Sequence, residues 1–330
     1  MNETIRVQTF DGRELTLRPD SALSLAQALF LAGPFRGLPL CSGLGRCGLC
    51  RVRFLADPPP VLAAEEKRLS AGELAQGWRL SCLRPAAPCS LALPEPRGEK
   101  PYATAFTAGP GPLSLAVDLG TTSLHWAALA EGRVAARGRG LNPQMGLGSE
   151  VMSRLAFAAR PEGAAVLRDL VLERLREIIR DLPARPESLV VAGNPAMTLI
   201  LLGLDAKGLR GAPYRLDYAG GDVRELAPDL PPAFIPPLFA PFVGGDLSAG
   251  LAALMLAPGA APEYPFLLAD MGTNGEFILA LSPGELLCAS VPLGPALEGV
   301  GLRFGRTAGP GAVELFDLGP AGLVPRFIDA

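Results

Sequence analysis

The sequence predicts two domains, a small α+β domain at residues 1–93 and a larger α/β domain at residues 113–330. Three observations support this division. The chain has 330 residues, about twice the ~150 residues of a typical domain. Five of its six cysteines lie before residue 90. Beyond residue 112 the chain carries one short pattern twice, an apolar strand that ends in Asp and is followed closely by Gly-Thr.

The composition excludes several classes of protein. Apolar residues make up 49% and charged residues 19% of the chain, so it can bury enough apolar surface to fold. The net charge is −3 without a run of Lys or Arg, and nucleic acid is not an expected partner because phosphate backbones require a basic surface. Residues 1–10 lack the apolar core of a signal peptide, and no stretch holds the ~20 clean apolar residues of a membrane span. We therefore expect a cytoplasmic protein with no membrane partner.

The small domain is expected to form a hairpin, a helix, a cysteine-rich loop and a strand, in this order. Apolar residues alternate through residues 3–18 on both sides of Asp11-Gly12-Arg13, which is typical of a β-hairpin. Ser21 or Ser24 caps a helix that ends near Leu31. The rest of the domain is expected to be a loop at residues 41–50, a strand at 51–55, helix at 63–75 and a closing strand at 78–82.

A proline-rich segment, residues 94–112, is expected to link the two domains. The larger domain mixes strands with helices, which indicates an α/β fold. Its longest predicted element is an amphipathic helix over residues 162–181, apolar on one side and charged on the other. Strands are expected at residues 113–118, 124–130, 188–191, 266–270 and 276–281, and further helices at 196–202 and 248–256.

Four cysteines of the small domain have the spacing of an iron–sulfur site. Cys41, Cys47 and Cys50 lie on one glycine-rich loop, and Cys82 follows much later. A pair of irons bridged by sulfide takes four thiolates, and glycines let the loop fold tightly around it. Zinc is the alternative, but zinc sites prefer two Cys-x2-4-Cys pairs and the sequence offers one. Cys89 is an alternative fourth ligand; Cys82 is preferred because it lies on a strand-like run, whereas prolines surround Cys89.

The run Cys-Ser-Gly-Leu-Gly-Arg-Cys-Gly-Leu-Cys, with Leu-Ser-Cys further on, resembles the β-grasp [2Fe–2S] ferredoxins. The resemblance implies a β-grasp fold for residues 1–93 and a [2Fe–2S] cluster whose ligands are Cys41, Cys47, Cys50 and Cys82. Five residues separate the first two cysteines, one more than in the plant-type spacing.

The repeated pattern of the larger domain points to phosphate binding. Two apolar strands end in Asp118 and Asp270, and each continues through a Gly-Thr turn into another strand. Glycine lets backbone amides approach phosphate oxygens, hydroxyls add donors, and an aspartate can hold a hydrated Mg²⁺ ion. The two hairpins resemble the nucleotide cleft of the actin, Hsp70 and sugar-kinase (ASKHA) group, which has a ribonuclease H-like fold. The resemblance implies that Asp118 and Asp270 position Mg²⁺ and water, while the phosphates are held by Gly120, Thr121, Thr122, Gly272, Thr273 and Asn274.

Further motifs resemble the reductive activators of corrinoid enzymes. They are Asn142-Pro-Gln144, Gly193-Asn194-Pro195, Phe242-Val-Gly-Gly-Asp246 and Gly294-Pro-Ala-Leu-Glu298-Gly299. This family joins a [2Fe–2S] ferredoxin domain to an ASKHA-type ATPase domain and uses ATP to return a Co(II) corrinoid to Co(I). The resemblance implies ATP and Mg²⁺ as ligands, an upstream electron donor, and a corrinoid protein or corrinoid-dependent methyltransferase as partner.

Two acids of these motifs have more than one interpretation. Asp246 precedes a helix and is either a helix cap or, by the resemblance, an acid that faces the nucleotide cleft. Glu298 either binds a cleft water or the ribose, or is an exposed turn acid.

The chain departs from the family pattern in two respects. It has a short linker where full-length members carry further domains, and it ends at Ala330, soon after Gly305. We therefore expect the ASKHA domain to be incomplete at its C-terminus. Two other functions remain open, a ferredoxin-type electron carrier whose ATPase-like domain only docks partners, and a small-molecule kinase, which the cysteine site disfavours.

Overall fold

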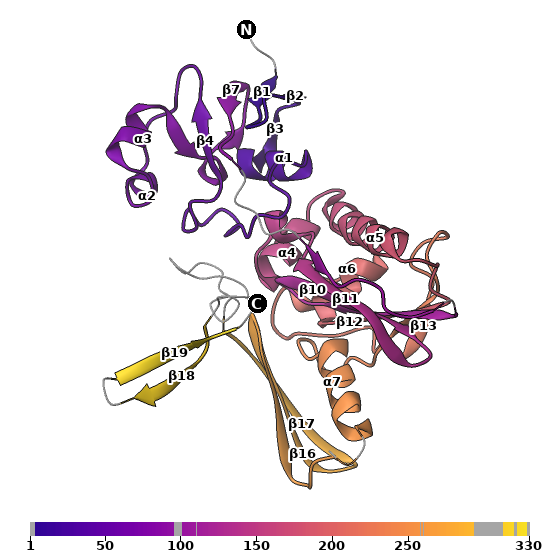
Figure 1. The fold of residues 1–330 in the computed structure, drawn as a ribbon. Coiled ribbons are helices and arrows are strands. Elements are labelled where there is room, and N and C mark those ends of the chain that lie inside the picture. Colours follow the sequence, from indigo (N-terminus) through magenta and orange to yellow (C-terminus); the bar gives the residue numbers. More distant parts are fainter. Residues whose placement is uncertain are drawn as a thin grey trace.

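The computed structural model describes residues 4–95, 101–109, 111–257, 259, 261–293, 313–319 and 322–328. Within these ranges the chain forms a small domain and a larger, two-lobed one (Figure 1). Glu298, one of the expected nucleotide contacts, lies outside the described residues. No helix in the described part of the chain combines the length and apolar character that crossing a lipid bilayer demands.

The small domain is a five-stranded sheet with one main helix, as in the β-grasp fold. β1 (Ile5–Gln8) and β2 (Glu14–Leu17) form the predicted antiparallel hairpin, and β1 also pairs in parallel with β7 (Cys89–Ala92). The sheet order is β2-β1-β7-β4-β5, with β4 at Arg51–Phe54 and β5 at Trp78–Leu80. Buried and exposed residues alternate strictly along β1, which is why period-two alternation predicted it.

Helix α1 (Leu25–Leu31) shares its core with this sheet. Of the two serines proposed as its cap, Ser24 is the one used: its hydroxyl accepts from the Gln27 N–H at 3.2 Å, and the Gln27 side chain accepts from the Ser24 N–H at 3.0 Å. Leu29 and Phe30 are buried on the inner side of the helix. The capping box fixes where the helix begins, and its apolar side fixes how it packs.

The helix expected at residues 63–75 is two helices, α2 (Ala63–Glu66) and α3 (Ala71–Ala75). Ser70 causes the break, because its hydroxyl accepts from the Glu73 N–H at 3.3 Å and so starts a new helix.

The strand expected to run to Cys82 ends at Leu80, and Cys82 lies in a 3₁₀ turn, η1 (Ser81–Leu83). A fully buried carboxylate holds this turn. Glu65 accepts from the Leu80 N–H at 2.9 Å and pairs with Arg84 at 2.5 Å, so both sides of the turn are tied to α2. One short antiparallel pair lies beside the turn, β3 (Asp20–Ser24) with β6 (Pro85–Ala86).

The first lobe of the larger domain is built on a seven-stranded sheet with the order β13-β14-β12-β9-β10-β11-β8. Strands β9, β10 and β11 form an antiparallel meander, and β12 pairs in parallel with the other edge of β9. β8 lies in the segment expected to be a linker and adds an edge strand to β11. The strands are β8 (Tyr102–Ala103), β9 (Leu113–Leu119), β10 (Ser123–Ala130), β11 (Arg133–Leu141), β12 (Ser188–Gly193), β13 (Asp222–Arg224) and β14 (Ala233–Ile235).

The helices of this lobe are α4 (Val151–Ala158), α5 (Gly163–Asp181) and α6 (Pro195–Leu202), with 3₁₀ turns η2 (Met145–Leu147) and η3 (Lys207–Leu209). The amphipathic pattern located α5 almost to the residue, and its apolar side is buried. Asn194 caps α6, since its side chain accepts from the Met197 N–H at 3.0 Å.

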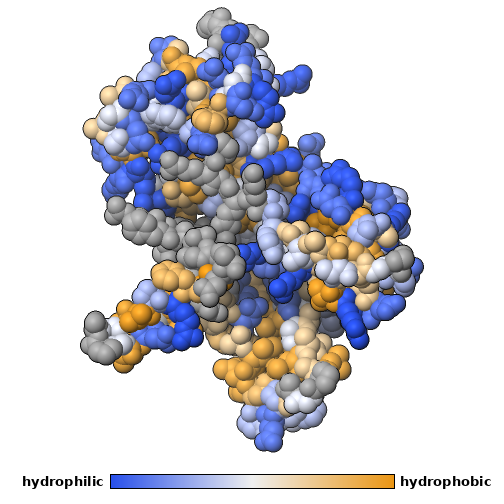
Figure 2. All heavy atoms as spheres, viewed as in Figure 1, coloured by the Kyte–Doolittle hydropathy of each residue, from blue (hydrophilic) through white to orange (hydrophobic). Residues whose placement is uncertain are grey.

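The second lobe repeats the meander but is thinly covered. Its elements are α7 (Gly245–Leu256), β15 (Phe266–Met271), β16 (Asn274–Ser282), β17 (Glu285–Pro292) and the hairpin β18 (Val313–Gly319) with β19 (Gly322–Phe327). Figure 2 shows apolar side chains at the surface around α7 and this sheet. Leu256 is 81% exposed, Leu267 61% and Leu287 55%.

The two domains pack directly against each other. Gly146 of η2 fits against the ring of Phe30 in α1 so closely that a Cβ atom there would lie 2.2 Å from the ring. Arg36 of the small domain also pairs with Glu173 of α5 at 3.2 Å. One continuous apolar core includes residues of both domains, so the small domain packs against the first lobe.

We expect Glu65→Gln to lower the free energy of unfolding of the small domain by about 3 kcal/mol, because it leaves the Arg84 charge buried without its carboxylate partner. Glu66→Gln is the matched control, since the neighbouring side chain is exposed. Urea unfolding of both variants measures the difference. Equal stability of the two variants would show that the Glu65 carboxylate does not hold the turn.

Candidate metal centre and nucleotide cleft

The four cysteines predicted to be ligands converge on one small cavity. Its volume is about 140 Å³, and its wall contains Cys41, Cys47 and Cys50 of the loop and Cys82 of η1. Gly146 of the larger domain completes part of the wall. The cavity therefore lies at the contact between the two domains.

The loop reaches this cavity through residues with positive φ. Gly43, Gly45 and Gly48 have φ angles of 90°, 63° and 70°, and Ser42 has 47°. Such angles suit glycine and are rare for other residues. The tight path turns the N–H groups of residues 46 and 47 toward the Cys41 sulfur, at 3.3 and 3.4 Å.

The thiols form two pairs. Cys41 is hydrogen-bonded to Cys47, and Cys50 to Cys82. The Cys47 hydrogen bond and backbone N–H groups lower the pKa of Cys41 to about 5. The hydrogen bond to Cys41 and burial raise the pKa of Cys47, while the bond to Cys82 and burial raise that of Cys50. A metal ion binds thiolates and would displace the thiol protons of this site.

This donor set fits a binuclear cluster better than a single ion. Two pairs of thiolates match two irons, each with two terminal sulfur ligands. The hydroxyl of Ser42 lines the cavity, is buried and has no hydrogen-bond partner in the described structure. An acceptor atom of a bound cluster would satisfy this donor.

Cys89, the alternative fourth ligand, is not part of the cavity wall. It begins strand β7, so the expectation that it lies in a proline-bounded loop is wrong, as is the strand expected at Cys82. Burial alone raises the pKa of Cys89 to about 11, which describes an inert thiol. Cys288 lies exposed on β17, in the other domain.

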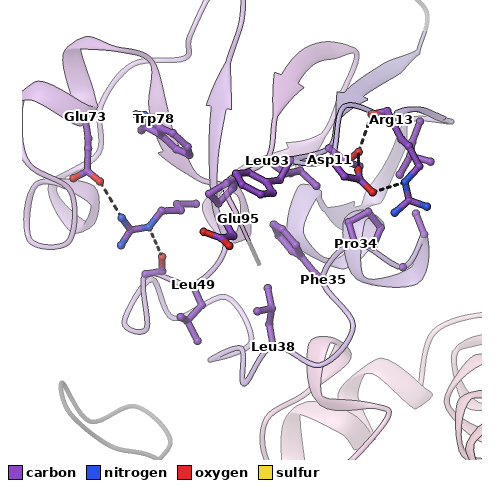
Figure 3. A pocket seen from close by; sticks show the side chains of 18 residues that line it. Asp11, Arg13, Pro34, Phe35, Leu38, Leu49, Glu73, Trp78, Leu93 and Glu95 are labelled. Carbon is purple, nitrogen blue, oxygen red and sulfur yellow. Dashed lines mark hydrogen bonds and ion pairs between the residues drawn. The ribbon is translucent and has the colours of Figure 1, made fainter. Parts of the chain in front are cut away.

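A larger cavity of about 640 Å³ lies beside the cysteine loop (Figure 3). Phe35, Leu38 and Trp78 give it apolar walls, and Leu49 brings it next to the cysteines. Two ion pairs belong to its rim, Arg13 with Asp11 at 2.7 Å and Arg51 with Glu73 at 2.9 Å. The sequence did not reveal this cavity, because its wall combines distant segments that share no motif.

The two Gly-Thr turns of the larger domain meet between the lobes. The Oγ1 atoms of Thr122 and Thr273 are 2.8 Å apart, and both residues are buried. The Thr121 hydroxyl accepts from the Asn194 side chain at 2.9 Å, which ties the first turn to the start of α6. At Gly120 a Cβ atom would lie 2.8 Å from a carbonyl oxygen of the same turn, so only glycine fits.

Four acids from four elements surround these turns: Asp118 of β9, Asp246 of α7, Asp270 of β15 and Glu276 of β16. Burial, with the charges of Asp246 and Asp270, raises the pKa of Asp118 to about 7, although its side chain still reaches solvent. Burial, with the charge of Asp270 adding to it, raises that of Asp246 to about 6. Burial and the same two aspartates raise the pKa of Glu276 to about 8. Such mutual repulsion is relieved when a divalent cation binds.

Asp246 does not cap its helix, because the N-cap of α7 is Gly244. Its Oδ1 accepts from the N–H of Leu247 at 2.9 Å, and its charge acts on Glu276 across the cleft. Of its two interpretations, this geometry favours a cleft acid.

Glu276 was not among the site residues predicted from the sequence. The Gly272 N–H donates to the Asn274 carbonyl at 2.9 Å and closes the second turn, and the Asn274 side chain bonds Glu276. Residues 274 and 276 share one face of β16 by strand alternation. That period-two relation was the signal that could have identified Glu276.

Two family models match the larger domain. The RACo middle region matches residues 113–258, and the C-terminal domain of RACo, an ASKHA domain, matches residues 265–328. The solved structure of a reductive activator for a corrinoid, iron–sulfur protein shares the fold. The aligned region spans 98% of this chain and 69% of the solved chain, at 22% identity and a TM-score of 0.58.

Two curated relatives are also similar. The corrinoid activation enzyme RamQ of Eubacterium limosum is 30% identical over 213 residues, 61% of this chain and 35% of the relative. The Co(II) methylated amine-specific corrinoid protein reductase of Methanosarcina barkeri is 28% identical over 199 residues, 55% of this chain and 36% of the relative. The chain spans about a third of the length of these relatives.

Fold and comparisons together define a protein in which a ferredoxin-type β-grasp domain precedes an ASKHA domain. Within this class the chain is similar to RACo over residues 113–328, where both RACo models match it, and to the relatives named for corrinoid activation. Both the fold class and the family resemblance read from the sequence are confirmed.

We expect Cys82→Ser to lose most of the iron and visible absorbance that the chain gains when loaded anaerobically with iron and sulfide, since a hydroxyl replaces a thiolate at the cavity. Cys89→Ser is the matched control and should load normally, because residue 89 lies outside the cavity wall. Iron and sulfide analysis of both variants measures this. The reverse result would make Cys89 the fourth ligand.

The acid cluster predicts that stability falls as the pH rises. The pKa of Asp118 in the folded chain is raised from 3.8 to about 7 and that of Glu276 from 4.5 to about 8, so the folded state holds protons that the unfolded state releases. The free energy of unfolding therefore decreases between about pH 4 and pH 8. Urea unfolding should show a shallower decrease for Asp118→Asn than for wild type, whereas Asp217→Asn, at an exposed acid, keeps the wild-type slope. Equal slopes for Asp118→Asn and wild type would exclude the coupling of these acids.

Proposed function

We propose that this chain holds a [2Fe–2S] cluster at Cys41, Cys47, Cys50 and Cys82 and uses it to reduce the Co(II) of a corrinoid protein to Co(I), with MgATP bound between the two lobes. The observation that carries the proposal is the convergence of two thiol pairs on one cavity, beside a domain that matches the RACo models. The family relation supports the corrinoid protein as partner.

Residues of the loop supply what an iron–sulfur centre needs. The N–H groups of Arg46 and Cys47 donate to the Cys41 sulfur and stabilise negative charge there, which tunes the centre. When bound, a [2Fe–2S] cluster supplies one-electron transfer, so that one electron from an upstream donor reaches Co(II) and yields Co(I). Leu44 at the loop tip is 58% exposed and gives a partner close access to the cysteines.

The nucleotide cleft supports the ATP part of the proposal. The turns around Thr122 and Thr273 would hold phosphate oxygens, and Asp118, Asp246 and Asp270 would hold Mg²⁺ and water. Binding between the lobes can change the state of a partner only by as much as the nucleotide prefers one arrangement of the lobes over another. Through this difference in affinity, ATP would assist the unfavourable reduction of Co(II) to Co(I).

A ferredoxin-type carrier that does not use ATP is the second candidate. The observation that favours it is the exposure of apolar side chains in the second lobe, including Leu267 and Leu287. Few side chains pack behind this wall of the cleft, so it would bind a nucleotide weakly. The exposed apolar side chains of the lobe would instead dock partner proteins.

Anaerobic reduction of a Co(II) corrinoid protein by the loaded chain tests both functions. We expect MgATP to accelerate the reduction at least tenfold, because the lobes close on it, and Asp118→Asn to abolish that acceleration. Asp217→Asn is the matched control. Reduction at one rate with and without MgATP would establish the carrier, and absence of reduction by a fully loaded chain would reject both functions.

A further inference from the structure

One turn connects the nucleotide cleft to the cysteine cavity. It follows strand β11 and begins at Asn142, which is 1% exposed. The Asn142 N–H donates to the carbonyl of Thr122 at 2.7 Å, and its side-chain amide donates to the carbonyl of Gly120 at 2.7 Å. Asn142 thus holds the first Gly-Thr turn, residues 120–122, through two short hydrogen bonds.

The other end of the same turn lies against the small domain. The 3₁₀ turn η2 contains Gly146, which forms part of the wall around Cys41 and Cys82. A Cβ atom at Gly146 would lie 2.2 Å from the ring of Phe30 in α1. Gly146 therefore touches both the cysteine cavity and the helix that packs beside it.

The segment between these ends is internally braced. The Gln144 N–H donates to Oδ1 of Asn142 at 2.8 Å, and the Gln144 side chain donates to the carbonyl of Leu167 in α5 at 2.8 Å. The Met145 N–H donates to the Asn142 carbonyl at 3.0 Å. Residues 142, 144, 145, 146 and 147 are all buried. A displacement at Asn142 therefore cannot be absorbed within the turn and reaches Gly146, because close-packed interiors transmit displacements.

We propose that the turn from Asn142 to Leu147 couples nucleotide binding to the electron affinity of the iron–sulfur centre, with Asn142 and Gly146 as positioning residues. The inference rests on the proposed function and names how its two sites communicate. A nucleotide bound at the first Gly-Thr turn moves Gly120 and Thr122, and Asn142 moves with them because it is hydrogen-bonded to both. The displacement then reaches Gly146 and changes the wall of the cysteine cavity.

The sign of the coupling follows from charge and from the reaction. A reduced centre carries one more negative charge than an oxidised one, and ATP is an anion, so nucleotide prefers the oxidised chain. Linkage is reciprocal, and nucleotide must then make the centre a stronger reductant. An effect on the order of tenfold in nucleotide Kd is typical of such coupling and equals a potential shift of 59 mV for one electron.

Equilibrium measurements on the full chain loaded with iron and sulfide test the proposal without a corrinoid partner. The Kd of a non-hydrolysable MgATP analogue is measured in the oxidised and the dithionite-reduced chain, and the midpoint potential is measured with and without the analogue. We expect about tenfold weaker binding to the reduced chain and a matching fall in potential. If the chain holds the cluster and binds the analogue, but with the same Kd in both redox states, the coupling is overturned. A chain that fails to load or to bind the analogue would instead contradict the proposed function.

Two substitutions test whether this turn is the route. Gly146→Ala should bring the ratio of the two Kd values close to one, because the added methyl group forces the turn away from Phe30. Phe30→Leu, which removes the ring, should reduce the ratio from the other side of the contact. Gly211→Ala is the control, since a Cβ atom there has no neighbour within 4 Å. A wild-type ratio in both Gly146→Ala and Phe30→Leu would show that the coupling does not pass through this contact.

Discussion

Four sulfur atoms must reach one cavity, and this constraint determines the conformation of much of the small domain. Three of them come from a loop that can bend inward only through left-handed backbone, which is where glycines Gly43, Gly45 and Gly48 stand. The fourth comes from the 3₁₀ turn η1, which follows strand β5. Glu65 holds that turn through a buried carboxylate, at the desolvation cost that such a group carries.

The larger domain depends on a different device, the repetition of one hairpin. Each copy ends an apolar strand in an aspartate and turns through Gly-Thr, and the two turns meet at the Thr122 and Thr273 hydroxyls. Where the two copies face each other, the charges of Asp270 and of Asp246 in α7 raise the pKa of both Asp118 and Glu276. In the proposed function a cation would screen these acids, and the hydroxyls of the Gly-Thr turns would bond phosphate groups.

Regular patterns predicted the regular parts of the fold. Alternation located the hairpin of β1 and β2, and the helical period located α5, because burial of one face leaves a periodic trace in the sequence. Strand β11 and helix α4 were missed. Alanine, arginine and glycine fill β11, and α4 is a short helix that buries Arg154 among its apolar residues, so neither shows a clean period.

The site was harder to read, since it depends on contacts between distant segments. The cysteine spacing identified the four side chains that the structure gathers, yet the reason given for choosing Cys82 over Cys89 was wrong, because tertiary packing made Cys89 the start of a central strand. The meeting of Thr122 with Thr273, and of Gly146 with Phe30, has no local signature at all.

The exposed sheet of the second lobe gives the cleft between the lobes one rigid and one compliant side. Seven strands and their helices back the first side, whereas the described strands β15 and β17 leave most of their side chains in solvent. Local opening of the compliant side costs little free energy, and any molecule that bridges the cleft must first restrict that motion. A protein that clamps the outer surface of this lobe would therefore tighten the binding of any ligand between the lobes, without contributing a single atom to the cleft.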